Sequence, residues 1–166
     1  MNDTLTRWLS EVGSSKDRAH LREILKPIVD RLSCQSHSSA GLEITAGGGT
    51  TAQIGSGSTW HGVVKGISLT KAAGTDMPAL SGSITAASFN IFCFFIDSAG
   101  TVTSAMGTEG TTRALVTFPP IPEGKAMIGY LVVTYASAFV GGTTALDTAT
   151  TLYVNVLGAF DPSVLV

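Results

Sequence analysis

The uneven distribution of charge along the chain is the feature that most constrains its fold. Residues 1–31 hold six of the ten Lys and Arg residues and five of the twelve Asp and Glu residues of a 166-residue chain. Apolar residues in this first part recur at the i, i+3, i+4, i+7 spacing of one helix face. The remainder is dense in Gly, Ser, Thr and β-branched residues without that period. The sequence therefore predicts two unlike parts, one helical and one β-rich.

Two amphipathic helices are predicted in the first part. Asp3 and Gly13 are placed to cap the first helix, while Ser14 and Asp17 form a capping-box pattern before the second, in which Pro27 is expected to introduce a kink. The two apolar stripes consist of Leu5, Trp8, Leu9 and Val12, and of Leu21, Ile24, Leu25, Ile28 and Leu32. We therefore expect a helical hairpin over residues 3–33, within an anchor that spans residues 1–33.

What covers these two stripes is open at this stage. Helices shorter than about 12–15 residues are marginal in water without tertiary packing. The stripes can pack on the β-rich part of their own chain, or dock onto another protein or a symmetry mate. The Ser-rich residues 34–41 are predicted to be a flexible linker, which favours docking because a polar tether lets the hairpin stand away from the body.

From residue 42 to residue 166 the pattern predicts an antiparallel β-sandwich or jelly-roll-like domain, so that the whole chain is mainly β. Short β-rich runs alternate with Gly, Ser, Thr, Asp and Pro, which is typical of such folds. The turn at residues 97–100 is predicted to close a hairpin. We predict strands over residues 42–46, 51–54, 62–70, 82–86, 89–97, 101–107, 113–118, 126–137 and 151–157.

Two of these strands are apolar on both faces. In residues 89–97, Phe92 and Phe94 alternate with equally apolar neighbours, and in the later strand Ile128 and Tyr130 are expected to face opposite to Met127 and the residues that alternate with it. Such strands are either central and covered on both sides, or they lie at a subunit contact. The small size of the domain favours the contact. We expect a homo-oligomer, most simply a trimer, whose interface contains Phe92, Phe94, Tyr130 and Tyr135.

The sequence offers little for catalysis or metal binding. His20, His37 and His61 lack a second ligand-type residue at metal spacing, so no metal cofactor is expected. Residues 47–52, "GGGTTA", match a nucleotide-binding pattern formally but precede no predicted helix, which favours a turn. Paired carboxylates can be distant in sequence, yet most acidic residues here stand beside turn residues. We predict no catalytic residue, no cofactor and no enzyme.

Several other features bound the function. Trp60 is either a sugar-stacking side chain or a core or interface residue, and the latter is favoured for a Trp at a strand start. The net charge of −2 gives no electrostatic reason to expect a nucleic-acid partner, and no apolar run approaches the roughly 18–20 residues of a membrane helix. The N-terminus lacks a secretory pattern, so we expect synthesis without export. Cys34 and Cys93 are predicted to be unrelated reduced thiols.

The order of three segments carries a resemblance. They read "FCFFIDSAGTVTSAMGT", "FPPIPEGKAMIGYLVV" and "FVGGTTALDTATTLYVNV". In this succession, residues 88–157 resemble a family of tailed-bacteriophage virion proteins. The resemblance implies a small β-domain found on phage particles, of the kind typically assigned as a head decoration protein, a head fibre or an uncharacterised structural protein. The N-terminal helices are not part of the pattern.

Together these observations predict a structural virion protein that decorates or cements the outer surface of a phage capsid. Its expected partners are the major capsid protein and further copies of itself, and it would be assembled in the host cytoplasm. The alternative is a binding module of a head or tail fibre that recognises a glycan or protein on the host surface. The residues expected to bind the capsid are Leu5, Trp8, Leu9, Val12, Leu21, Ile24, Leu25 and Ile28.

Overall fold

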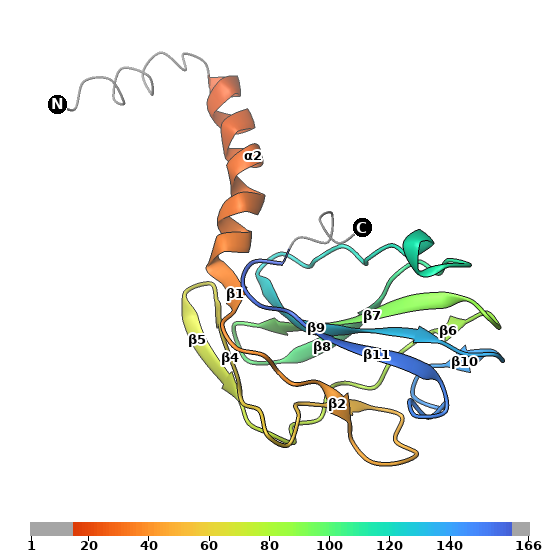
Figure 1. Ribbon diagram of the computed structural model, residues 1–166. Helices are drawn as coiled ribbons and strands as arrows, with labels where there is room; N and C mark the ends of the chain where they lie inside the picture. Colours follow the sequence, from red (N-terminus) through yellow and green to blue (C-terminus); the bar gives the residue numbers. More distant parts are fainter. Residues whose placement is uncertain (1–14, 161–166) are drawn as a thin grey trace.

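In the part of the chain that the structure describes, one helix precedes a β-domain in which all strand pairs are antiparallel. The computed structural model describes residues 15–160, with side chains from Arg18 onward. Helix α2 (Ser15–Ser33) stands out from one end of the β-domain (Figure 1). A mainly β chain with an N-terminal helix was predicted and is confirmed. The predicted hairpin is not shown, because the described N-terminal part contains one helix and the helix expected over residues 3–13 lies outside the described residues.

The strands within residues 15–160 form four sheets. The largest has the order β11-β9-β7-β8, a second has the order β1-β4-β5, and β10-β6 and β2-β3 are two-stranded. The strand bounds are β1 (Cys34–Ser36), β2 (Glu43–Ile44), β3 (Ala52–Gln53), β4 (Trp60–Val64), β5 (Ile67–Lys71), β6 (Ser83–Ile84), β7 (Phe89–Asp97), β8 (Val102–Met106), β9 (Lys125–Thr134), β10 (Phe139–Val140) and β11 (Thr150–Asn155).

Two strand predictions are wrong for local reasons. The single strand expected over residues 62–70 is the hairpin β4–β5, because Lys65 and Gly66 both adopt positive φ (51° and 78°), as the central residues of a type I′ turn require. The strand expected over residues 113–118 is instead a 3₁₀ turn, Arg113–Leu115. Strand β10 was not predicted.

The expected flexible linker begins with a strand. Cys34–Ser36 pairs antiparallel with β4, and both Cys34 and Ser36 are buried while Gln35 between them is half-buried. The segment is polar in composition, but it alternates in the way that a strand at the edge of a core requires. Helix α2 is therefore joined directly to the sheet, without a mobile tether at residues 34–36.

The four-stranded sheet separates two apolar clusters of the same chain. The larger cluster contains Phe92 and Phe94 of β7 together with Trp60, whereas the smaller contains Cys93 and Phe95. The second face of the sheet is covered by residues 116–121 and by the segment that follows β11. A strand that is apolar on both faces is therefore a central strand here, covered on both sides within one chain.

This covering corrects the expected oligomer contact. Phe92 and Phe94 have no exposed surface, Tyr130 is 8% exposed, and Tyr135 is half-buried against the larger cluster. Phe92 and Phe94 are consequently core residues that a second copy cannot touch. These apolar strands therefore do not indicate an oligomer, because the chain itself supplies the surface that buries them.

A register shift in the β7–β9 pair reverses part of the predicted side-chain alternation. Phe94 pairs with Gly129 but Phe95 pairs with Met127, so Ile128 is the additional residue of a bulge. Ile128 therefore joins the larger cluster, whereas Met127 and Tyr130 lie in the smaller one. The expected division, with Ile128 and Tyr130 on the same face, is wrong at this point.

Candidate interaction surface

The last turns of α2 are attached to the β-domain by polar contacts, which we call the helix root. The side chains that make them come from the last two turns of the helix, and their partners lie before β9 and after β11. The contacts are the ion pair between Lys26 and Glu123 (2.9 Å), the hydrogen bonds from the Gly124 amide to the Asp30 carboxylate (2.9 and 3.0 Å), and the bond from Arg31 Nη1 to the Phe160 carbonyl (3.0 Å). The helix is thus held at its base.

The ion pair of the helix root is exposed. The hydrogen bond from Lys26 and its charge, with a smaller contribution from the charge of Lys65, hold the pKa of Glu123 below its usual value. The Lys26 and Glu123 side chains retain 65% and 61% of their exposure, so solvent screens their attraction. The pair therefore helps to orient the helix and contributes little to the free energy of unfolding.

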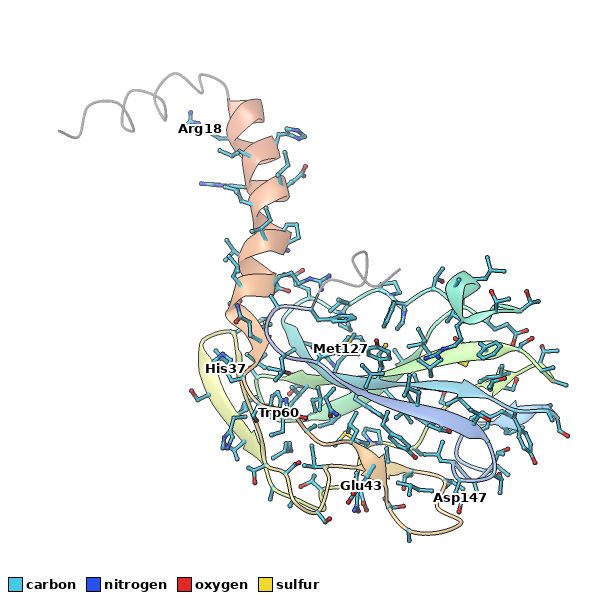
Figure 2. All side chains as sticks on the ribbon, viewed as in Figure 1. Arg18, His37, Glu43, Trp60, Met127 and Asp147 are labelled. Carbon is cyan, nitrogen blue, oxygen red and sulfur yellow. The ribbon has the colours of Figure 1, made fainter. Side chains whose placement is uncertain are left out.

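Below the root, a buried hydroxyl connects three strands. Ser36 Oγ of β1 donates to the Met127 carbonyl of β9 (2.6 Å) and accepts the indole N–H of Trp60 on β4 (3.0 Å). Figure 2 shows Trp60 and Met127 in the interior below the helix. Trp60 is fully buried, so it is a core residue, as favoured from the sequence, and no sugar can stack on it.

The opposite side of α2 carries an exposed apolar surface, which we call the α2 stripe. Five of its side chains are exposed, namely Ile24 (49%), Leu25 (45%), Ile28 (51%), Val29 (61%) and Leu32 (63%), and Leu21 is half-buried. At about 100° per residue, these positions lie across the helix from Lys26 and Asp30, whereas Arg31, seven residues after Ile24, lies at one edge of the stripe. The predicted helical period is confirmed, and within residues 18–160 the β-domain leaves these side chains largely uncovered. Val29 was missed, although it stands four residues after Leu25.

Two depressions flank the base of the helix and combine stripe and root residues. One, of about 440 Å³, is lined by Leu25 and Val29 on the apolar side and by Lys26 and Glu123 on the charged side. The other, of about 380 Å³, lies between the helix residues around Ile28 and the end of the described chain. An apolar centre with a charged rim is the common arrangement of a protein interface.

The acidic residues of the β-domain shape its loops. Glu43 accepts hydrogen bonds from Gln53 Nε2 (3.0 Å) and the Ser56 amide (2.8 Å), and these bonds hold its pKa below the usual value. Asp97 accepts from two amides of its own turn, and Asp147 accepts from the Gly48 amide (2.7 Å). Figure 2 shows Glu43 and Asp147 on the side of the domain far from the helix. These carboxylates stabilise turns, as expected.

The histidines and cysteines are separated from one another. Between residues 15 and 160, no group of three or more His, Cys, Asp or Glu side chains is placed to hold a metal ion. His20 and His37 are exposed, and His61 Nδ1 contacts Thr70 Oγ1 (3.1 Å). Cys34 and Cys93 are buried and unpaired, which confirms the prediction of two separate thiols.

Burial raises the pKa of the Cys93 thiol, because a thiolate would be poorly solvated in the smaller cluster. The neutral thiol is a weak nucleophile, so Cys93 acts as a packing residue.

Within the part of the chain that the structure describes, no helix is both long and apolar enough to cross a membrane. Comparisons of the chain with protein-family models, with curated proteins and with solved structures found no match.

Proposed function

We propose that this chain is a structural protein of a tailed-bacteriophage virion that decorates the outer surface of the capsid. Its N-terminal part binds the major capsid protein, and its β-domain, for which we propose a sandwich or jelly-roll-like arrangement, is displayed on the particle. It works as a homo-oligomer, most simply a trimer, and acts by burying surface rather than by catalysis. Two observations support this proposal: the resemblance of residues 88–157 to phage virion proteins, and the geometry of α2.

The observation that carries the proposal is the exposure of the α2 stripe on a helix whose base is fixed. A free monomer leaves Leu25, Ile28 and Leu32 largely in water. Apolar surface gains roughly 25 cal/mol for each Å² removed from water, so these side chains favour association. Because the helix root holds α2 in one direction, the stripe is presented as a preformed surface. Such an element is suited to assembly.

The β-domain supports the same function through its construction. Its two clusters bury both faces of the central strands, and Glu43, Asp97 and Asp147 are engaged by loop amides. A domain built in this way is a stable body that can be displayed on a particle, while the helix makes the attachment. The charged helical part thus serves attachment, and the β-rich part with few charges serves as the displayed body.

Co-sedimentation with undecorated capsids of the encoding phage tests the proposal. We expect the full-length chain to sediment with the capsids, and Trp8→Asp combined with Leu9→Asp to abolish this binding, because a charged group cannot be buried without a partner. Leu115→Asp is the matched control, since Leu115 is exposed on the β-domain. Wild-type binding by the double variant would move the attachment site to the β-domain. Binding to host cells but not to capsids would support the fibre alternative instead.

A further inference from the structure

The α2 stripe has the spacing of a coiled-coil seam. Leu21, Leu25, Ile28 and Leu32 follow one another at intervals of four, three and four residues, which is the alternation of a and d positions in a heptad. In this frame Leu25 and Leu32 occupy a positions, whereas Leu21 and Ile28 occupy d positions. Arg18 stands at the preceding a position and ends the apolar seam toward the N-terminus.

The structure selects this frame over the alternative. A frame with Ile24 at d would also place Arg31 at d, in the centre of a seam. Arg31 instead turns to the β-domain, where its guanidinium donates to the Phe160 carbonyl (3.0 Å) and its side chain is half-buried. The seam that remains free is therefore the one formed by Leu21, Leu25, Ile28 and Leu32.

We propose that the α2 stripe is occupied by the same helix of two further copies of this chain, in a parallel three-stranded coiled coil. This inference rests on the oligomer included in the proposed function and names its contact surface. Leu at a with Ile at d favours three or four strands over two. Ile24 at g and Val29 at the following e position widen the apolar surface beyond a two-stranded seam.

Charge complementarity supports the parallel arrangement. Asp17 stands at the g position that precedes Leu21, and Arg22 stands at the following e position. In a parallel coiled coil a g position lies near the next e position of the neighbouring helix, so the sequence pairs an acidic g position with a basic e position of an adjacent copy. Two contacts of the helix root lie away from the seam, because Lys26 and Asp30, which contact Glu123 and Gly124, stand at the outer b and f positions. Arg31 stands at g, so its contact with Phe160 places the β-domain beside one edge of the seam.

The capsid contact then belongs to residues that lie outside the seam. The four residues of the first stripe, Leu5, Trp8, Leu9 and Val12, precede the predicted helix end at Gly13, so the heptad frame of α2 does not extend to them. None of them continues the a and d series. The two stripes therefore serve two partners: the α2 stripe binds sister helices, and the earlier stripe binds the capsid.

Sedimentation equilibrium of the full chain over the micromolar range tests the inference. We expect a mass three times that of the 17.1 kDa chain, and we expect Leu25→Asp combined with Leu32→Asp to reduce it to the mass of a single chain. Both residues are exposed in the monomer, so the β-domain should remain folded, as thermal unfolding would verify. The control is Leu115→Asp combined with Leu157→Asp. It replaces two exposed leucines that lie outside the helix, and it should leave the trimer intact.

Orientation is tested by charge exchange and by cross-linking. Asp17→Arg or Arg22→Asp alone should raise the concentration required for half-association, and the two together should restore it. Ile28→Cys, at a d position, should form disulfide-linked dimers within the trimer under mild oxidation, whereas Ala19→Cys, at a b position, should not. The wild-type chain supplies the background, because Cys34 and Cys93 are buried.

Three results would overturn the inference: a monomeric wild-type chain, a trimer that persists in the Leu25→Asp, Leu32→Asp variant, and an Ile28→Cys variant that forms no cross-link. These results are distinguishable from failure of the proposed function. A trimer that dissociates as described but never sediments with capsids would refute the virion attachment and retain the coiled coil. Capsid binding by a chain that is monomeric in solution would refute the coiled coil and retain the virion attachment.

Discussion

Strand β7 and helix α2 both carry large apolar side chains, which are buried in β7 and exposed in α2. Phe94 of β7 has no exposed surface, because two parts of the same chain cover the two faces of its strand. Leu25 and Leu32 of α2 remain largely exposed on a helix whose other side is attached to the domain. The first set of side chains stabilises the monomer, whereas the second is available for association. Apolar composition therefore does not by itself identify an interface.

The largest expected effect contrasts these two regions directly. Phe94→Ala should lower the free energy of unfolding by about 3–5 kcal/mol, because it removes a buried ring and leaves a cavity. Leu25→Ala should change it by less than about 0.5 kcal/mol when the chain is dilute enough to be monomeric. Urea denaturation of both variants measures the difference. Equal losses would mean that the helix packs on its own domain after all.

A second effect concerns the buried hydroxyl below the helix. Ser36→Ala leaves Trp60 Nε1 and the Met127 carbonyl without their shared partner. We expect a loss of roughly 1–3 kcal/mol in the free energy of unfolding, because buried polar groups without a partner forfeit their hydration. Ser137→Ala, at an exposed loop position, is the control and should be neutral. An unchanged midpoint for Ser36→Ala would show that water replaces the hydroxyl.

Close packing of β9 against β11 gives a third test. A Cβ added at Gly129 would lie 2.5 Å from the Val154 carbonyl oxygen, so Gly129→Ala forces the two strands apart. We expect destabilisation by about 1–2 kcal/mol. Gly57 has no atom within 4 Å of an added Cβ, and Gly57→Ala should leave the melting temperature nearly unchanged. A melting temperature that does not differ between the two variants would contradict this account of the sheet.

A smaller effect is expected at the helix root. Asp30→Ala removes the carboxylate that accepts the Gly124 amide, at a cost of about 1 kcal/mol for a partly exposed hydrogen bond. Amide hydrogen exchange should accelerate at Gly124 and in the last turns of α2 but not in β7. Glu23→Ala, at an exposed helix position, should leave these rates unchanged. Uniform acceleration across the β-domain would mean that the root supports the whole fold.

The smallest expected effect is a pH dependence of the same root. Because the hydrogen bond and charge of Lys26 lower the pKa of Glu123, the pair is fully formed above the ordinary pKa of a glutamate. It is lost as the pH falls through the lowered pKa. Exchange at the base of α2 should therefore accelerate in acid, and Glu123→Gln should remove this step. A step that persists in Glu123→Gln would assign it to another carboxylate.

Much of the local structure could be predicted from the sequence. The bounds of β7, the turn after Asp97 and the end of α2 at Ser33 follow from apolar runs and turn residues, and the structure has them as predicted. The strand β1 was missed because its polar residues suggested a tether, and the β4–β5 turn was missed because Lys65 is an unusual residue at positive φ. Local patterns were reliable where propensity and tertiary context agreed.

The candidate surface was predicted in part. The period of Leu21, Leu25, Ile28 and Leu32 was visible, but the side of the helix that remains free was not. That choice depends on the Asp30 contact with Gly124, which joins residues 94 positions apart. No spacing rule within α2 contains this information.

The sequence by itself determined the change from a helical to a β-rich part, since residue periodicity acts over neighbouring positions. It also determined which side chains are apolar. Only the tertiary structure decided which of them are covered, because burial depends on segments remote along the chain, such as those that enclose both faces of β7. The segments before β9 and after β11 hold the base of α2 and leave the stripe exposed. The free energy that an apolar side chain contributes depends on how much of its surface is removed from water, and the folded molecule decides this.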